Sequence, residues 1–587
     1  MATQEAREAA HRQDAQWLSY KFDRYREDGT APPRAPTVGE HGNWELPVAK
    51  EFRHGLRPAQ KPIEWKPIEA PARVPAELDH RDDTKGLHKH ERAVWRRIMA
   101  VHDMFPPDVD GDITYQRLLG YGEHNVAMLY TFDDGTAKAR EFVLKIGLYK
   151  PLNDPRIRRE RRMLQKVRRS QHIIQMYDPE ELGLTVSPGP RLEFDEVDDS
   201  EPPLSDSGDD SPSDDEPEPK RRRRDYTQTQ LKKKRKQMEN AYWARTDPLS
   251  IAGRTPKHDP TVEEIGRRDY ILLEYMPNGT LESFIARLNE ADEKCPNRVL
   301  WSFWVCLIRA CIAMAYPVHR HNRKRNDAAF AGALSEMIPA QAVRREKIRP
   351  FVHFAIEPRN VLIGRIPSDV TYDEHSDEVT PILKLAGFGQ SEVIKEQRRN
   401  WYYERRRTCG RHGYYAPEQF TELWDTFAPN MDGDEICEQH LAGNYGPAMN
   451  VWGIALTLLC VITRSEPTLP PRAATAKILA RRGDKKSGWW NHYTYGAMLV
   501  KEPKNERWSY VDEELREVLA KCLARDPAHR PDLQTLLDTA IKKCEDDGPY
   551  VYADGETAAT NDFVFKWMRN LLEHTTLGVA TAPWGPI

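Results

Sequence analysis

The sequence contains no Cys-x-x-Cys pair, although it has eight cysteines in 587 residues. Structural zinc sites are usually built from closely spaced Cys and His ligands, so this spacing argues against a zinc-binding framework. Several of the cysteines lie inside apolar runs, which is typical of buried, reduced thiols in an intracellular protein. They are Cys295, Cys306, Cys311, Cys409, Cys437, Cys460, Cys522 and Cys544.

Long uninterrupted apolar runs are also missing. The run at 301–318 is broken by Arg309, and the run at 454–462 is too short to cross a bilayer. The first residues, MATQEAREAAHRQDAQW, carry acidic side chains and no apolar core, unlike a secretory signal. We therefore expect an intracellular protein of the nucleus or cytoplasm with no membrane partner.

A surplus of one charge sign is absent as well, because the net formal charge is -4 although 30% of the residues are charged. This balance gives no whole-chain argument for nucleic-acid binding. Only 39% of the chain is hydrophobic and it contains 44 prolines, so a good fraction lies outside any core. Residues 1–87 are Pro-rich and are expected to be largely disordered. Residues 88–111 are expected to form a helical strut, with Val94, Trp95 and Ile98 at helical spacing.

Two segments concentrate charge. Residues 195–260 join an acidic, Ser/Pro-rich stretch to the basic clusters Lys220–Arg224 and Lys232–Lys236, and they are expected to form a disordered insert. The two clusters have the spacing of a nuclear-import signal, and a charge-balanced loop is the alternative. Residues 320–349 form a second, basic insert that is expected to be a solvated loop, with a partner-binding patch as the alternative. Candidate acceptors of phosphate from an acid-directed kinase are Ser205, Ser207, Ser211 and Ser213.

N-terminal to both of these segments lies a turn that could approach a phosphate. Residues 115–146 predict three strands, and Gly120 and Gly122 lie in the turn between the first two. Glycines there let backbone amides approach a phosphate, but the same pair also serves plain hairpins. Lys145 lies near the end of the third strand, and Glu160 lies in a basic helix predicted over 156–170.

The rest of the chain predicts a further strand and several helices. They are a strand at 270–275, helices at 281–288, 299–318 and 510–524, and an apolar helix from Asn450. In residues 350–389 two short apolar runs flank the turn Glu357-Pro358, and a third run stops at Gly387-Phe388-Gly389. An Arg- and aromatic-rich segment then ends at Ala416-Pro417-Glu418, and Arg530 follows the last predicted helix.

This ordered set of elements resembles the protein-kinase superfamily, with its Gly loop, strand Lys, helix Glu, hinge, catalytic loop, D-F-G, A-P-E and final Arg. The loop HFAIEPRN at 353–360 is similar to that of a divergent group of fungal kinases. The resemblance covers 112–545 and leaves 546–587 as a C-terminal extension. It implies an α+β, bilobal, eukaryotic Ser/Thr kinase-like fold, with a small β-rich N-lobe and a larger, mainly helical C-lobe.

The resemblance also implies roles for single residues. Lys145 would pair with Glu160, and the backbone of Glu274 and Met276 would face an adenine ring. The full set of nucleotide-binding residues that it implies is Gly120, Gly122, Lys145, Glu160, Glu274, Met276 and Asn360. Glu418 would pair with Arg530 in a buried, structural ion pair, and Asn450 stands where the family usually has Asp.

Both catalytic acids of the family are missing. Ala355 stands at the position of the base, whose role is worth about 10²–10⁴ in rate. Gly387 stands at the position of the Asp that holds magnesium. Asn360 alone is a poor magnesium ligand, because hard cations prefer carboxylates. Glu357, a conceivable substitute base, is expected to point elsewhere. We therefore expect no catalytic residue and no magnesium site, whereas ATP binding stays open.

The leading hypothesis is a pseudokinase: a kinase-like domain that acts as a binding, scaffold or regulatory module for protein partners. It would hold ATP, if at all, without a metal. One alternative is a weakly active Ser/Thr kinase that works through Lys145, Glu160 and Asn360. The other is a nuclear, nucleic-acid-associated protein, based on the basic segments 220–236, 320–347 and 398–411, which contain no recognised reader motif.

Overall fold

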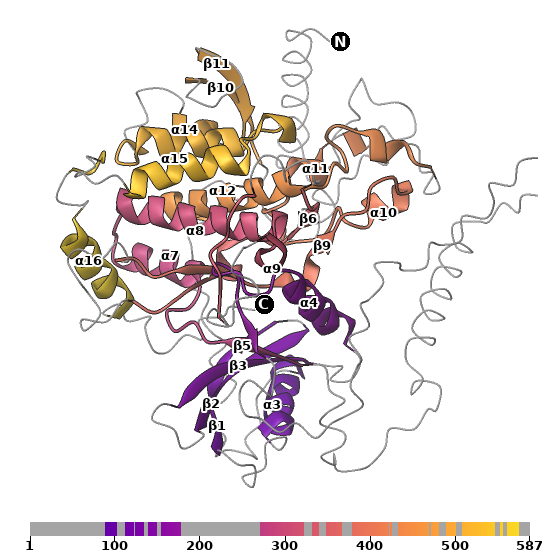
Figure 1. The fold of residues 1–587 in the computed structure, drawn as a ribbon, viewed down its shortest axis with the longest axis vertical. Coiled ribbons are helices and arrows are strands. Elements are labelled where there is room, and N and C mark those ends of the chain that lie inside the picture. The colour runs from indigo at the N-terminus through magenta and orange to yellow at the C-terminus, as the bar shows by residue number, and fades with distance from the viewer. Residues whose placement is uncertain are drawn as a thin grey trace, which may run out of the picture.

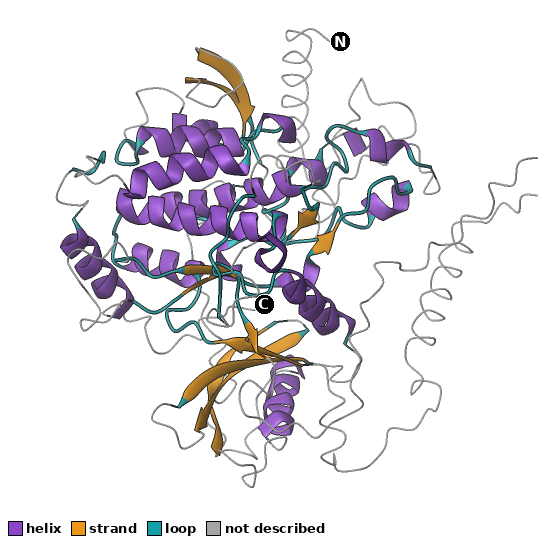
Figure 2. Ribbon diagram, in the orientation of Figure 1, coloured by secondary structure: helices purple, strands orange, loops and turns teal. Residues whose placement is uncertain are grey.

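The computed structural model of the chain is a mixed α+β protein, in which one antiparallel sheet lies beside a larger group of helices (Figure 1). The five-stranded sheet lies at one end of the molecule, and most of the helices lie toward the other end (Figure 2). The structure describes residues 89–102, 112–122, 124–133, 139–148, 154–177, 270–321, 332–339, 348–366, 379–421, 423–424, 433–468, 471–479, 489–500, 508–545, 552–555 and 560–573.

The sheet has five antiparallel strands. They are β1 (Asp112–Tyr121), β2 (Asn125–Asp133), β3 (Arg140–Gly147), β4 (Met176–Tyr177) and β5 (Tyr270–Glu274), in the spatial order β1-β2-β3-β5-β4. The strands predicted over 115–146 and 270–275 are therefore confirmed. The inner strand β3 is buried on both faces, because its alternate side chains enter two different cores.

Helix α3 (Lys89–His102) covers one face of the sheet. Its buried side chains Val94, Trp95, Ile98 and Val101 share a core cluster with Phe142, Leu144 and Ile146 of β3, and the helix contacts β2. Spacings of three and four residues place these apolar side chains on one face of the helix. The predicted strut is confirmed over 89–102, and its remainder lies outside the described residues.

Helix α4 (Pro155–Lys166) follows β3 and begins with a conventional cap. The side chain of Asp154 accepts a hydrogen bond from the backbone N of Arg156, and Pro155 occupies the first helical position. The helix was predicted to reach Ser170, and this prediction is wrong by four residues. The helix ends at Lys166, with Val167 as its C-cap, and the left-handed φ of 65° at Arg169 prevents a right-handed helix from continuing to Ser170.

The larger part of the protein is helical. Its main helices are α7 (Leu281–Glu290), α8 (Asn297–Ala315), α9 (Val318–His321), α12 (Pro447–Thr463), α14 (Glu513–Cys522), α15 (Leu533–Glu545) and α16 (Asn561–Glu573). Helix α8 packs against α12 and α15 (Figure 1). By length and composition it is apolar enough to cross a membrane, but most of it is buried among other helices. It serves as a core helix of this fold.

Short elements connect these helices. They are β6 (Phe351–Val352), η5 (Pro358–Asn360), β7 (Val361–Ile363), β8 (Leu383–Leu385), η6 (Phe388–Gln390), β9 (Glu392–Val393), α10 (Asn400–Glu404), α11 (Pro417–Phe420), η8 (Glu435–Glu438), β10 (Ala474–Leu479), β11 (Trp489–Thr494), α13 (Ala497–Val500) and η10 (Pro527–His529). Strand β6 pairs with β9 and β7 pairs with β8. These pairings bring the loop at 353–360 beside the loop at 386–390.

Residues 332–339 of the basic insert pack against the rest of the protein. Leu334 forms a β-bridge with Ser170, and Glu336 is only 2% exposed. The two Glu336 oxygens contact the backbone N of His172 at 2.8 Å and its ring Nδ1 at 2.7 Å. The expected solvated loop is therefore wrong for this stretch, because an apolar side chain and a carboxylate find partners on the α4–β4 connection.

The C-terminal extension contributes a packed helix, α16. The ring of Trp567 meets Phe284 of α7 edge to face at 6.2 Å, and its Nε1 donates to Glu293 at 2.8 Å. All eight cysteines are free thiols, as predicted, and the buried ones are Cys295, Cys306, Cys311, Cys460 and Cys522.

Several predictions lie outside the described residues. They concern the segments 1–87 and 195–260, including both basic clusters and the four candidate acceptor serines, and parts of the C-terminal extension 546–587. These stay predictions.

Candidate functional site

A buried ion pair joins the sheet to α4. Lys145 Nζ of β3 lies 2.9 Å from Glu160 Oε1, and their side chains are 6% and 4% exposed. The predicted pairing of these two residues is confirmed. The pair lies beside the Gly387-Phe388-Gly389 turn, because a Cβ on Gly389 would stand 3.5 Å from Glu160 Oε2.

The Gly120–Gly122 turn is closed by its own hydrogen bond. Gly120 pairs with Ala127 of β2, and Ala127 pairs on its other side with Lys145. The backbone N of Gly122 donates to the carbonyl of Asn125 at 2.8 Å. This amide already has a partner within the hairpin, so the geometry matches the plain-hairpin alternative at least as well as a phosphate loop. A role in nucleotide binding stays a prediction.

The apolar side chains on the Lys145 face of the sheet are deeply buried. Leu119, Ala127 and Val143 have at most 1% exposure, and Leu362 of β7 has 0%. They belong to the same core cluster as the helices. Met276, which was predicted to face an adenine ring with its backbone, is 3% exposed. The sequence alone did not indicate how tightly this region packs.

Glu274, the other predicted hinge residue, has a partner that sequence reasoning missed. Lys384 Nζ of β8 lies 2.7 and 2.8 Å from the two Glu274 oxygens. Glu274 Oε1 also accepts a hydrogen bond from the backbone N of Gln175. These contacts tie β5 to β8. A lysine inside the apolar run PILKLA was the available signal, since buried lysines are nearly always paired.

Ala355 is buried, and its backbone is hydrogen-bonded on both sides. Its N donates to His353 Nδ1 at 3.2 Å, and its O accepts from Asn360 Nδ2 at 2.8 Å. His353 Nε2 in turn lies 3.1 Å from the carbonyl of Ala386, to which it donates. Burial lowers the pKa of His353 to about 3, so the ring is neutral. His353 therefore serves as a structural link between the two loops.

Gly387 leaves no room for a side chain. Its φ is 77°, in the left-handed region. A Cβ built on Gly387 would lie 2.5 Å from Asn360 Oδ1 and 2.7 Å from Asn360 Cγ. Asn360 is held in this position by its hydrogen bond to the carbonyl of Ala355. The amide of Asn360 thus occupies the space that a carboxylate at position 387 would need.

Phe388 fixes this turn in the core. Its ring is fully buried and meets His353 and Phe351 edge to face, at 4.5 and 6.1 Å between centroids. Its element, η6, also contacts α4. The turn, the histidine loop and α4 therefore form one packed unit.

Glu357 points into a charged cluster, away from Ala355. Its Oε2 lies 3.3 Å from Arg359 and 3.4 Å from Arg411, and Arg411 also contacts Glu282 and Glu466. Burial raises the pKa of Glu357, and it raises that of Glu282 to about 7. The cluster fastens the segment around Arg411 to α7 and η5. Sequence reasoning did not identify Arg411 as the partner.

Glu418 and Arg530 form the predicted buried pair. Two parallel hydrogen bonds of 2.7 and 2.9 Å join them, and their side chains are 0% and 1% exposed. Asn450 is also structural, because its amide bonds the backbone N of His353 at 3.0 Å and the carbonyl of Phe351 at 2.7 Å. The two hydrogen bonds of Asn450 anchor β6 and the start of the loop at 353–360 to α12.

At the position where the protein-kinase resemblance would place a magnesium ligand, the residues do not suit a magnesium ion. Gly387 offers no ligand atom, and Asn360 offers only a neutral amide, whereas hard cations prefer carboxylates. Within the described ranges, no group of three or more His, Cys, Asp or Glu side chains is placed to hold a metal ion.

No protein-family model and no curated protein matches this chain.

Proposed function

We propose that this chain is a protein-kinase-like domain that does not transfer phosphate and acts as a binding or scaffold module for protein partners. The small antiparallel sheet, α4 beside it and the larger helical part agree with the bilobal arrangement of that superfamily. The Lys145–Glu160 and Glu418–Arg530 pairs also support the resemblance.

The contact between Gly387 and Asn360 carries this proposal. Phosphoryl transfer depends mainly on positioning and on stabilising the charge of the phosphates, and the metal ions supply much of that stabilisation. Here the metal-binding acid is replaced by a glycine whose Cβ position is filled by the Asn360 amide. A chain that places no carboxylate at this position has no evident way to hold the bridging ion.

The position of the base supports the same conclusion. Ala355 has no group that accepts a proton, and the nearest acid in the loop, Glu357, is engaged by Arg359 and Arg411. The neutral ring of His353 is committed to two backbone groups. None of the three residues is arranged as a general base for a bound hydroxyl.

The proposal is tested by measuring phosphate incorporation. Full-length protein is incubated with radiolabelled ATP and magnesium or manganese, with and without generic protein substrates. We expect no incorporation above that of the Lys145→Ala variant, and none from the single variants Ala355→Asp and Gly387→Asp. Incorporation by the wild-type chain that is lost in Lys145→Ala would overturn the proposal.

A weakly active Ser/Thr kinase is the second candidate, because the Lys145–Glu160 pair is intact at 2.9 Å. The same pair also joins β3 to α4, so it has a structural role that needs no catalysis. The incorporation assay separates the two candidates.

For the nucleic-acid alternative, half of the six arginines in 398–411 are used within the protein, whereas Arg398, Arg399 and Arg405 are exposed. Arg406 pairs with Glu392, Arg407 contacts Glu404 and the Trp424 ring, and Arg411 pairs with Glu466. These guanidinium groups are used within the protein.

A further inference from the structure

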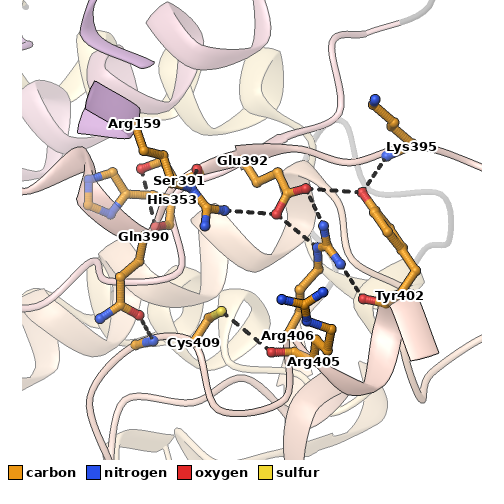
Figure 3. Close-up of polar contacts among 11 residues, drawn as sticks. Arg159, His353, Gln390, Ser391, Glu392, Lys395, Tyr402, Arg405, Arg406 and Cys409 are labelled. Carbon is orange, nitrogen blue, oxygen red and sulfur yellow. Dashed lines mark hydrogen bonds and ion pairs between the residues drawn. The ribbon is translucent and has the colours of Figure 1, made fainter. Parts of the chain in front are cut away.

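The carboxylate of Glu392 in β9 contacts side chains from α4 and from α10 and the turn after it (Figure 3). Its Oε2 lies 2.8 Å from Arg159 Nη2 of α4 and 2.9 Å from Arg406 Nε, and its Oε1 contacts Arg406 Nη2. Tyr402 of α10 donates to the same Oε1 at 3.4 Å. One carboxylate therefore joins α4, β9 and the end of α10.

The α4 side of this network reaches the loop of Ala355. Arg159 Nε donates to the carbonyl of Ser391 at 3.1 Å, in addition to its contact with Glu392. Ser391 Oγ donates to the carbonyl of His353 at 3.3 Å. Helix α4 is thus tied to β9 through Glu392 and, through Ser391, to the histidine loop.

The α10 side is stacked and partly buried. The Arg406 guanidinium lies 3.4 Å from the centroid of the Tyr402 ring, and the Tyr402 hydroxyl accepts a hydrogen bond from the backbone N of Lys395 at 2.9 Å. Burial and the neighbouring Glu392 raise the pKa of Tyr402 to about 12, so the hydroxyl keeps its proton and donates it. Stacking fixes the direction in which Arg406 presents its donors.

The Glu392–Arg406 part of this network is more buried than an ordinary surface ion pair. The side chains of Glu392 and Arg406 are 19% and 11% exposed, whereas Arg159, which makes the link to α4, is 38% exposed. Charge-assisted, forked hydrogen bonds at such sites are stronger than neutral ones, and salt screens partly buried pairs less than exposed ones.

Kinase-type loops are often ordered by a phosphate that gathers arginines. In residues 391–411 the candidate acceptors Ser391, Tyr402 and Tyr403 are buried, and only Thr408 is exposed. The arginines Arg159 and Arg406 already have a carboxylate between them.

We propose that Glu392 is a permanent clamp that couples α4 to residues 391–411 and holds both in one arrangement without phosphorylation. The surface formed by this segment is then constitutive, so a partner that binds it needs no phosphate switch. The clamp rests on these contacts alone and stands whether or not the chain transfers phosphate.

Hydrogen–deuterium exchange on the full chain tests the clamp. In Glu392→Gln we expect amide exchange to rise about fivefold in both 391–411 and α4, the size expected for a coupled pair. Arg406 contacts Glu392 from the side opposite α4. We expect Arg406→Ala to raise exchange in α4 as well. Glu573→Gln, in the exposed pair with Arg569, is the matched control and should change neither region.

A second variant keeps the test decisive if Glu392→Gln does not fold. In Arg159→Gln the link to α4 is lost, so exchange should rise in α4 and, because coupling between two regions is reciprocal, in 391–411 as well. If Arg406→Ala changes 391–411 but leaves α4 as in the wild type, the two regions are not coupled and the proposal is wrong.

A separate experiment tests whether the arrangement of residues 391–411 depends on a phosphate. Phosphatase-treated wild type and Thr408→Ala should exchange like the untreated protein. If either loosens 391–411 as much as Glu392→Gln does, a phosphate orders the segment and the clamp is overturned. None of these readouts uses phosphate transfer from ATP, so failure of the clamp and failure of the proposed function are distinguishable.

Discussion

The Asn360 amide stands where a Cβ on Gly387 would have to go, at 2.5 Å from its Oδ1. This contact binds together the two loops at which the sequence lacks acids. The Asn360 side chain fills the space beside Gly387, and its Nδ2 donates to the carbonyl of Ala355.

The first prediction concerns this contact. Gly387→Ala should destabilise the protein by more than the ~1–2 kcal/mol cost of a Cβ in the left-handed region. The added cost arises because Asn360 must give up its hydrogen bond to the Ala355 carbonyl. Urea unfolding of the full chain measures it.

Two glycines serve as controls for that measurement. Gly555 has a φ of 96° with nothing within 4 Å of a Cβ, so Gly555→Ala carries backbone strain alone. Gly446 has an extended φ and open space, so Gly446→Ala should change little. Equal costs for Gly387→Ala and Gly555→Ala would show that Asn360 yields freely.

The second prediction concerns Glu418 and Arg530. Glu418→Gln should cost about 3–5 kcal/mol of unfolding free energy, because it leaves a buried guanidinium without its charged partner. The double variant Glu418→Gln/Arg530→Met should be less destabilised than the sum of the single changes. Calorimetry or urea unfolding tests this, with Glu573→Gln as the exposed control. Additive costs would contradict the pairing.

The third prediction is an acid-side loss of stability from His353. Its pKa of about 3 in the folded protein lies below the ordinary 6.5, so the unfolded chain binds more protons. Stability should fall as the pH drops from 6.5 towards 3, by up to about 1.4 kcal/mol per unit from this group. His353→Asn keeps an acceptor for the backbone N of Ala355 but does not titrate. Its deficit relative to wild type should shrink with acidification, and a constant deficit would refute the assignment.

The fourth prediction has the opposite sign and concerns His172. Burial lowers the pKa of His172, but contacts with Cys306 and Glu336 raise it by more, to about 9, above the ordinary 6.5. The stabilisation should be complete below pH 6.5 and should be lost as the pH rises through 9. Glu336→Gln should therefore cost more at pH 6 than at pH 9.5 in urea unfolding. An equal cost at both pH values would show that His172 and Glu336 do not form a charged pair.

The sequence predicted the elements that show a regular hydrophobic pattern. Lys145 and Glu160 each lie in an element with clear strand or helix periodicity, so their elements could be anticipated, whereas their pairing was implied only by the resemblance to protein kinases. The pairing of Glu418 with Arg530 was likewise implied only by that resemblance.

Contacts that depend on irregular segments could not be predicted. The Glu336–His172 contact places part of a charged insert against the α4–β4 connection, and no periodicity marks either side. Arg411 meets Glu357 across two loops for the same reason. The packing of Asn360 beside Gly387 depends on distances of a few ångströms, which a sequence pattern does not encode.

The most direct test of the central claim is a thermal-unfolding titration of the full chain with ATP, in EDTA and in magnesium, beside Lys145→Ala. Stabilisation by ATP in EDTA that is lost in Lys145→Ala would indicate a nucleotide held without metal, and no shift at all would indicate a module that binds no nucleotide. In both cases we predict that magnesium adds nothing, because position 387 offers no carboxylate. Stabilisation that appears only with magnesium and disappears in Lys145→Ala would contradict the account.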